Sequence, residues 1–576
     1  MATSSKKSVP SPLAFGLVAW TPALVLLVQL VQNWVDIPFM DEWDVGNVFL
    51  KFKQGTLSFA DLIGQHNESR FFFPHLILML LVRWTRWDAR VPILLLFATV
   101  CVISWLLWKL LRRIPNLSLP AKLAAMFAVN LLLFSPSQHE SWLMGLNFSL
   151  VVPSAMLACA LLINASAQPI EGKVIIGICC GIFSTFSNAN GMEIWPLAFG
   201  GFAAGETASP QRKWTWYGVY VAAAAAAIWF YFRDYHPPAH HPAFGSALAT
   251  PFDLARFFFR WLGSSISVGN NEIAAYLGAA LLTAFVVTAA YVWWKARDPS
   301  MRNVCYVWTA IGAYALIAGV STSMGRLGLG LQTAYSSRYI TFSVYLPIGL
   351  IGLFCALAAW RQTRETAEDC ALRAPVAACA FGIILVLALG TFVTTMKGMA
   401  YERTIRVLGT TALVFSDLMP NNPDLKRLHP NSEWAKNQYR RFHDAGFIRL
   451  RKVSAAIAAT HFPRSGADAT NGSLDVCHVE NATVKMVGSV VRSKSKTPDY
   501  ILVTRRSDTN ALTPVAALAL DPAKANHEGC VPFELFPVVA NLSPGPCELT
   551  VWAVDSRHNS FGQLAHSRDV IIPVKP

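Results

Sequence analysis

Residues 12–44, PLAFGLVAWTPALVLLVQLVQNWVDIPFMDEWD, join an apolar run to a cluster of acids. The run at 12–33 is long enough to cross a bilayer, whose hydrocarbon core takes about 20 residues of helix. Two lysines precede it and no small-residue cleavage site follows it, so we interpret it as an uncleaved first span that enters from the cytoplasm. The chain then emerges on the outer side with Asp36, Asp41, Glu42 and Asp44.

The composition of the whole chain predicts an integral membrane protein. Of the 576 residues, 54% are hydrophobic and 14% are charged, whereas soluble domains carry about 25% charged residues. Apolar stretches of spanning length recur as far as residue 396 and then stop. We therefore expect a mainly α fold, with a polytopic bundle of transmembrane helices at 1–396 followed by a water-exposed region.

The basic residues set the expected topology. If 71–87 is a helix lying on the outer membrane surface, the basic loops all fall on the cytoplasmic side. These loops also account for the net charge of +14 without a nucleic-acid partner. About eleven spans result, and because that number is odd the C-terminal region is expected outside. The spans lie at 12–33, 90–110, 120–135, 146–164, 173–187, 192–205, 215–232, 272–294, 303–323, 341–360 and 374–396.

The C-terminal region divides into two parts. Residues 397–470 alternate basic and apolar residues at helical spacing, which predicts a helical extracytoplasmic connector. Residues 471–576 hold short alternating runs such as ATVKMVGSVV and CELTVWAVD, separated by turn signals. This pattern is typical of an antiparallel β-sandwich. Two of its cysteines, Cys477, Cys530 and Cys547, could pair in an oxidising compartment, but the sequence does not choose which.

Two interpretations of the acidic stretch stay open. Asp41 is a suitable helix N-cap, and Glu42 and Asp44 would complement the helix dipole in the first turn. A functional role is favoured by a second polar cluster in the same outer loop, 34–88. That cluster is QHNESR at 65–70, which supplies His66, Asn67, Glu68 and Arg70.

Further polar residues fall in the other segments expected outside. The stretch FSPSQHESW at 134–142 gives Gln138, His139 and Glu140 beside aromatic residues, a mixture that suits sugar hydroxyls and sugar faces. Glu193 lies at a predicted span end and should face a cavity or a partner, because a carboxylate facing lipid is costly. Arg326 and Arg338 lie in the outer segment at 324–339, where snorkelling to the membrane surface is the alternative to a binding role.

A carboxylate and arginines at a membrane surface suit one reaction in particular. An acceptor hydroxyl that attacks the anomeric carbon of a lipid-borne sugar phosphate must lose a proton, and a partly desolvated Asp can take it. The departing phosphate needs fixed cations, and Arg offers a planar fork for it. The candidates for phosphate binding are Arg70, Arg326 and Arg338.

The chain resembles the GT-C superfamily of polytopic glycosyltransferases, which take sugars from polyprenyl-phosphate carriers. The shared features are a cytoplasmic start, one span, and a long first outer loop that opens with an acidic pair, here Asp41 and Glu42, and carries a surface helix. The resemblance implies that Asp41 is the catalytic base, with Glu42 second, and Glu140 is the nearest match to an acid that many members carry in a later outer loop. Some members need a divalent metal and others do not, so the resemblance leaves a metal open and implies no other cofactor.

From these features we expect a glycosyltransferase of the bacterial inner membrane that works on the periplasmic side. It would move a sugar from a polyprenyl-phosphate donor to a glycan or lipid acceptor of the cell envelope. Asp44, His66, Asn67, Glu68, Gln138, His139, Glu140 and Glu193 would line the substrate pocket. The alternatives are an O-antigen polymerase or ligase-like enzyme that uses lipid-diphosphate glycans, and a polysaccharide or lipid transporter, which would carry ionisable residues deep within its spans.

Overall fold

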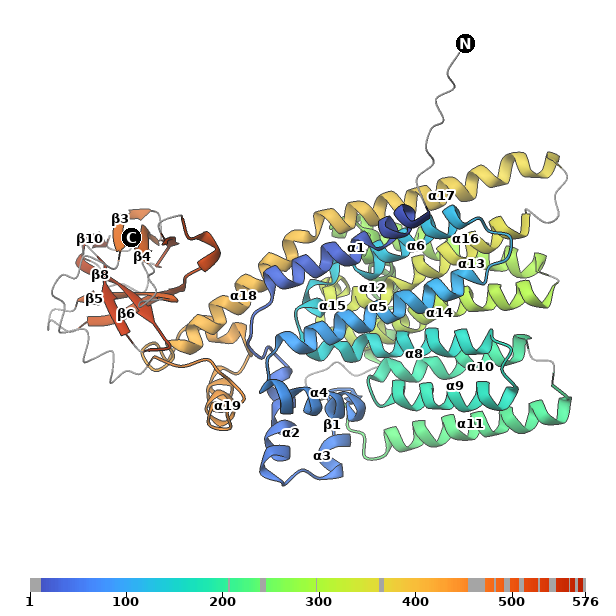
Figure 1. Ribbon diagram of the computed structural model, residues 1–576, viewed down its shortest axis with the longest axis horizontal. Coiled ribbons are helices and arrows are strands. Elements are labelled where there is room, and N and C mark those ends of the chain that lie inside the picture. Colours follow the sequence, from blue (N-terminus) through green and yellow to red (C-terminus); the bar gives the residue numbers. More distant parts are fainter. Residues whose placement is uncertain are drawn as a thin grey trace, which may run out of the picture. The chain divides into compact units, whose positions relative to one another are not determined.

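The computed structural model describes residues 12–572 apart from 206–207, 239–244, 297, 362–366, 454–471, 481–482, 492–497, 507–511, 527–528, 538–544, 559 and 565–567. The described chain is mainly helical, with a C-terminal β-sheet region (Figure 1). It divides into two compact units. Unit 1 comprises residues 1–34, 51–85 and 89–402, and unit 2 comprises residues 35–50, 86–88 and 403–576.

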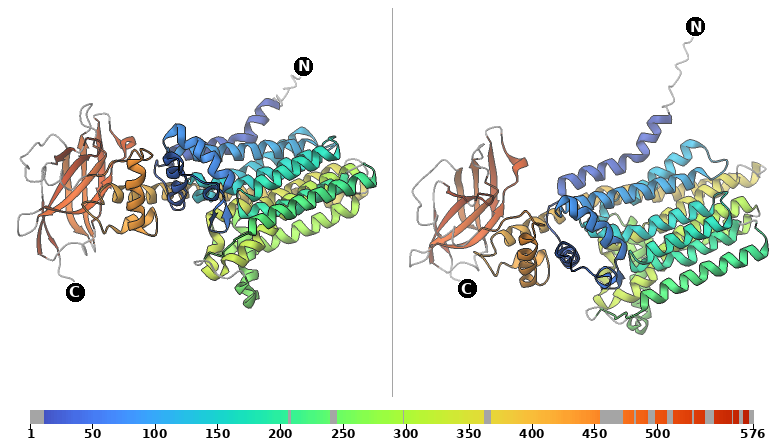
Figure 2. Two further views of the ribbon diagram at one scale, coloured as in Figure 1. Left: turned by 90° about the horizontal axis from the view of Figure 1, so that it is seen from below. Right: turned by 60° about the horizontal axis from the view of Figure 1, so that its bottom comes forward.

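Unit 1 is a bundle of helices that lie side by side in all views (Figures 1 and 2). Two further helices, α2 (Glu42–Gln54) and α18 (Met396–Val414), are each divided between the units, after Leu50 and after Glu402. The helices of unit 1 are α1 (Pro12–Asn33), α3 (Phe59–Ile63), α4 (Phe72–Thr85), α5 (Arg90–Arg112), α6 (Leu119–Leu133), α7 (His139–Trp142), α8 (Phe148–Asn164), α9 (Ile170–Thr185), α10 (Ile194–Gly205), α11 (Pro210–Phe232), α12 (Pro251–Gly263), α13 (Asn271–Lys295), α14 (Pro299–Arg326), α15 (Ser337–Ser343), α16 (Tyr345–Arg361) and α17 (Ala367–Thr394).

Within the described residues, nine helices are long and apolar enough to cross a membrane. These helices are compatible with the predicted multi-pass membrane protein, whereas the expected count of about eleven spans is not confirmed. The difference lies in α9 and α10, which have 16 and 12 residues. The apolar helix α4 has 14 residues, or about 21 Å of helix, which is shorter than the hydrocarbon core of about 30 Å.

A buried polar contact joins three of the long helices. Asn130 of α6 is fully buried, and its side-chain amide donates to the carbonyl of Ala19 in α1 at 2.7 Å. The hydroxyl of Ser104 in α5 donates to the Asn130 Oδ1 at 2.5 Å. Because a polar group without a partner is costly in an apolar interior, these bonds favour one register of the three helices.

Glycines bring other helices into close contact. A Cβ at Gly278 of α13 would lie 1.9 Å from the carbonyl oxygen of Phe259 in α12. A Cβ at Gly352 of α16 would lie 1.9 Å from the indole of Trp308 in α14. Small residues of this kind allow the close helix packing found in membrane proteins.

Unit 2 contains the acidic stretch and the C-terminal region. Its helical part includes the later turns of α18 and α19 (Ser432–Asp444). The start of α2 packs here, with the ring of Trp43 stacked at 6.1 Å on Phe442 of α19. The guanidinium of Arg406 in α18 lies 3.9 Å from the ring centre of Phe39. Residues 35–50 are thus built into the same core as the segment that the sequence predicted to be a helical connector.

The β-sheet region of unit 2 holds two antiparallel sheets. One has the strand order β3-β4-β7 and the other the order β10-β8-β5-β6, with β9 paired to β8. The strands are β3 (Gly472–Glu480), β4 (Thr483–Val491), β5 (Tyr500–Arg506), β6 (Leu512–Ala519), β7 (Cys530–Leu535), β8 (Gly545–Asp555), β9 (Ser560–Gln563) and β10 (Arg568–Ile572). Cys477, Cys530 and Cys547 lie in β3, β7 and β8 as thiols.

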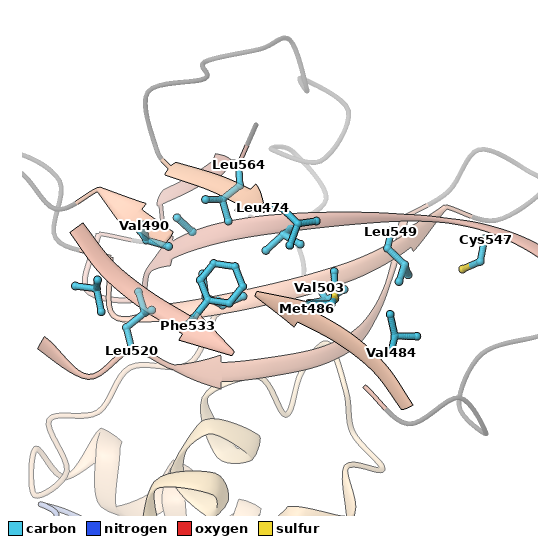
Figure 3. Packing of buried hydrophobic residues seen from close by; sticks show 14 residues of the cluster. Leu474, Val484, Met486, Val490, Val503, Leu520, Phe533, Cys547, Leu549 and Leu564 are labelled. Carbon is cyan, nitrogen blue, oxygen red and sulfur yellow. The ribbon is translucent and has the colours of Figure 1, made fainter. Parts of the chain in front are cut away.

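The two sheets share one hydrophobic core (Figure 3). Alternate residues of β4, such as Val484 and Met486, point toward the same cluster as Val503 and Leu549 of the other sheet. Residues of the opposite parity in β5 and β8, such as Leu502, pack with Val414 and Phe415 at and after the end of α18. Both faces of the larger sheet are therefore covered, which explains why β5 is apolar along most of its length.

The glycine contact between α12 and α13 generates a testable prediction. We expect Gly278→Ala to destabilise the protein by about 1–3 kcal/mol, because the new methyl group overlaps a backbone carbonyl that cannot turn away. The control is Gly218→Ala in α11, where a Cβ meets nothing within 4 Å. Thermal unfolding in detergent measures both, and equal melting temperatures for the two variants would contradict this close packing.

Candidate functional site

Polar segments from distant parts of the sequence meet at one end of unit 1. The side chain of Gln65 donates to the carbonyl of His236 at 2.5 Å, and the backbone N–H of Ala189 donates to the hydroxyl of Ser69 at 3.2 Å. The backbone N–H of Glu140 donates to the hydroxyl of Ser337 at 2.9 Å. We call the segments 65–70, 135–147, 187–193, 231–236 and 321–338 the polar end. All five lie in or overlap segments that the sequence predicted to be on the outer side.

The hairpin β1 (Gln65–His66) and β2 (Ser69–Arg70) is fixed to the polar end by Arg70. Arg70 is only 8% exposed. Its Nε donates to the carbonyl of Tyr231 at 2.7 Å, and its two terminal nitrogens donate to the carbonyls of Ile63 and Arg233 at 3.1 and 2.5 Å. Because the guanidinium already donates to three backbone oxygens, we interpret Arg70 as a structural residue that holds the hairpin on α11. Arg326 and Arg338 are then the better candidates for phosphate binding.

Two smaller contacts complete the hairpin. Asn67 adopts φ 49°, a left-handed conformation that Asn tolerates better than most residues, and so forms the turn. The ring of His66 lies 5.4 Å from the ring of Phe71, and the Tyr231 hydroxyl donates to the carbonyl of Glu68. These contacts use the backbone carbonyl of Glu68 and not its carboxylate.

Glu68 forms an ion pair with Arg326 at the C-terminal end of α14. The Glu68 Oε1 lies 2.7 Å from one terminal nitrogen of Arg326, and the side chains are 33% and 19% exposed. The other terminal nitrogen of Arg326 is buried and has no hydrogen-bond partner among the described residues. A charged N–H without an acceptor is costly, so this nitrogen favours an incoming anionic oxygen.

A second carboxylate–arginine pair joins Glu140 to the segment around α15. The Arg338 Nε lies 3.7 Å from Glu140 Oε2, and the hydroxyl of Ser336 donates to the same oxygen at 3.1 Å. The side chains of Arg338 and Glu140 are 46% and 38% exposed. This pair is therefore more open to water and to a ligand than the pair of Glu68 and Arg326.

The neighbours of Glu140 have different roles. Gln138 is buried, and its side-chain amide donates to the carbonyls of Leu132 and Leu133. It therefore caps the C-terminal end of α6. His139 pairs through its Nδ1 with Glu402 of α18 at 3.2 Å. We therefore interpret Gln138 as a structural residue and keep His139 as a candidate for the site.

Glu193 lies where η3 (Ala189–Glu193) meets α10. Its Oε1 accepts a hydrogen bond from the hydroxyl of Ser321 in α14 at 3.3 Å. Its Oε2 is buried and has no partner among the described residues. The expectation that this acid faces a partner and not lipid agrees with the contact to Ser321, which lies on the same helix as Arg326.

The acidic stretch in unit 2 combines structural and accessible carboxylates. Glu42 is 7% exposed, and its carboxylate accepts a hydrogen bond from the backbone N–H of Phe39 at 3.0 Å. Asp44 lies in the first turn of α2, and Asp41 directly precedes the helix; both are partly exposed. Glu42 thus has a structural role at the start of α2, which is one of the two interpretations that the sequence left open. Asp41 is the better candidate for a catalytic role, because its side chain is partly exposed.

The short helix α3 is stabilised by charge. Ser58 and Asp61 form a reciprocal capping box, and Lys51 contacts the Asp61 carboxylate at 2.5 Å. The hydrogen bond from Lys51, followed by those from the Ser58 backbone and side chain, lowers the pKa of Asp61 to about 2. Because the carboxylate is more acidic in the folded protein, this contribution to stability is lost only as the pH falls from about 4 through 2.

Several residues of the polar end were missed by the sequence analysis. Glu402 lies in a segment that was assigned to the connector, and only its position in an apolar helix could have singled it out. Ser321 and Ser336 contact the candidate carboxylates through hydroxyls, a residue type too common in sequences to signal a site. Tyr231 contributes a carbonyl to Arg70, and no side-chain pattern predicts that role.

The role of Arg70 can be tested by stability. We expect Arg70→Gln to lower the melting temperature and to expose residues 63–70 to protease, because three carbonyls lose their donor. Each buried carbonyl left without a partner costs about 1–3 kcal/mol. The control is Arg233→Gln, whose side chain is 63% exposed and whose carbonyl still accepts from Arg70. A stable Arg70 variant that fails to bind donor would instead make Arg70 a substrate group.

The chain was compared with protein-family models, curated proteins and solved structures. No protein-family model, no curated protein and no solved structure matches the chain.

Proposed function

We propose that the protein is a membrane glycosyltransferase that moves a sugar from a polyprenyl-phosphate donor to an acceptor hydroxyl. The observation that supports this proposal most directly is Arg326, whose buried terminal nitrogen has no acceptor among the described residues while its other terminal nitrogen holds Glu68. A guanidinium with an unused N–H at the end of a membrane helix is suited to a phosphate carried by a lipid.

The reaction is a single displacement at the anomeric carbon. The acceptor oxygen forms a bond to that carbon as its proton passes to a carboxylate, and the bond between the carbon and the phosphate oxygen breaks. The polyprenyl phosphate leaves with both electrons of that bond. Because the acceptor attacks from the opposite face, the configuration at the anomeric carbon is inverted. By resemblance to GT-C enzymes we assign the base to Asp41, whose carboxylate is partly exposed.

The two arginine pairs supply charge stabilisation for the leaving group. In the protein without donor, Glu68 and Glu140 each hold one arginine in place. A phosphate that binds either arginine gains a cation that is already oriented, so little reorganisation is needed as negative charge develops. The resemblance leaves a divalent metal open, and the proposal does not depend on one.

We place this enzyme in the bacterial inner membrane with the polar end facing the periplasm, as the positive-inside rule suggests. The acceptor is then a glycan or lipid of the cell envelope. We interpret the two-sheet region of unit 2 as a β-sandwich that holds the acceptor glycan.

Glu193 favours a second candidate function, transport of a lipid-linked saccharide. An ionisable group buried within a helix bundle is typical of substrate or ion pathways in transporters, and Glu193 has one buried oxygen without a partner among the described residues. A transporter moves its substrate unchanged, so the chemical fate of the donor separates the two functions.

The first test is donor consumption. The purified protein is incubated with a panel of polyprenyl-phosphate sugars and an envelope extract as acceptor, and mass spectrometry follows the free polyprenyl phosphate. We expect one donor to be consumed, and Asp41→Asn to reduce the rate about 100-fold or more through loss of the general base. The control is Asp444→Asn in α19, whose side chain is 81% exposed. A donor panel that stays intact, or an Asp41 variant as fast as the parent, would reject the enzyme as proposed.

A second test separates phosphate binding from the chemical step. We expect Arg338→Gln to raise the KM for the donor about 10-fold to 100-fold, because a charge-assisted bond to phosphate contributes about 1.5–3 kcal/mol. Arg212→Gln is the matched control, since Arg212 also pairs with a glutamate, Glu171, and is 56% exposed, but lies at the start of α11, at the other end of the bundle. If both variants changed the KM equally, general surface charge and not a phosphate site would explain the effect.

A further inference from the structure

A cavity of about 310 Å³ lies in unit 1 at the end away from the polar end. It is bounded by the segment after α5, the segment after α8 and the first turns of α14. The residues that give it chemical character are Arg113, Ser166, Ser300, Asn303, Val304 and Trp308. None of them belongs to the site described above.

The lining changes from polar to apolar along two helices. In α14 the lining residues run from Ser300 and Asn303 in the first turns to Trp308 deeper in the bundle. At the end of α5 the lining runs from Arg113, which follows the helix, back to Leu110. The cavity therefore has a polar mouth at the helix ends and apolar walls inside, which suits an amphiphilic ligand.

The charge at the mouth is positive and fixed. A terminal nitrogen of Arg113 donates to the carbonyl of Leu162 at 2.7 Å, which holds the guanidinium beside the end of α8. Asp298, which precedes α14, does not line the cavity, and its carboxylate caps the helix by accepting from the Met301 N–H. An anion thus meets a guanidinium whose orientation is set before it binds.

Asn303 adds a separate requirement. Its Oδ1 is buried and has no hydrogen-bond partner among the described residues. Since this oxygen only accepts, a ligand that satisfies it must carry a hydroxyl or N–H donor in addition to its anionic group. A headgroup that combines a phosphate with a hydroxyl meets both requirements.

We propose that this cavity binds a phospholipid whose headgroup carries a phosphate for Arg113 and a hydroxyl for Asn303, with its acyl chains along the apolar lining. The site is independent of the proposed glycosyl transfer and lies at the opposite end of the same bundle. It would anchor the ends of α5 and α14 to one leaflet of the membrane.

Native mass spectrometry of the full chain in dodecyl maltoside tests the proposal. The probes are phosphatidylglycerol, which has both groups, diacylglycerol, which lacks the phosphate, and inorganic phosphate, which lacks the chains. We expect one phosphatidylglycerol to be retained at concentrations where the other two are not. Arg113→Gln should weaken its binding at least about 10-fold, a change of about 1.4 kcal/mol.

The adjacent Arg112→Gln is the matched control, because Arg112 is also exposed and does not line the cavity. A second variant, Ala167→Trp, fills the cavity from an exposed lining position and should displace the lipid without disturbing the core. Equal losses in Arg112→Gln and Arg113→Gln would overturn the proposal, as would retention of diacylglycerol. Inorganic phosphate that binds as tightly as the lipid would overturn the lipid assignment.

Discussion

The hydrocarbon core of a bilayer admits only backbone whose N–H and C=O groups bond one another, and unit 1 is built to this constraint. The backbone groups of a long apolar helix form hydrogen bonds within that helix. Polar side chains are therefore expected at helix ends, or inside the bundle where another polar group is their partner. Asn130 shows the second case, because Ser104 and Ala19 satisfy its amide completely enough for full burial. The ion pairs of Glu68 with Arg326 and of Glu140 with Arg338 show the first case, because both lie at helix ends.

The polar end follows from the same constraint. Short helices such as α7, α15 and η3 interrupt the regular bundle. Their ends leave backbone N–H and C=O groups that need hydrogen-bond partners from side chains. Arg70 does this for three carbonyls, and Gln138 does it for the end of α6. Arg326 and Arg338 differ from Arg70 because each pairs with a carboxylate. Arg326 also has a terminal nitrogen without a partner among the described residues, and the Arg338 side chain is 46% exposed.

The sequence predicted those parts of the fold that depend on local periodicity. Apolar length identified the long helices, and two-residue alternation identified strands such as β4 and β8. The span count stays a prediction where length is marginal, since α9 and α10 are apolar but have only 16 and 12 residues. Residue type alone also could not distinguish Arg70 from Arg326, because only the tertiary structure shows which guanidinium the backbone already occupies.

The helix α14 explains how the candidate residues are held in place. It carries Ser321, which contacts Glu193, and Arg326, which contacts Glu68, less than two turns apart. The middle of α14 cannot shift easily, because Trp308 packs on Gly352 and a Cβ at Gly349 would overlap the backbone of Gly312. A binding group on a helix locked by backbone contact keeps its orientation without a ligand, whereas the same group on a loop would have to be ordered on binding. The glycines between α14 and α16 thus contribute to the proposed phosphate site although none of them reaches it.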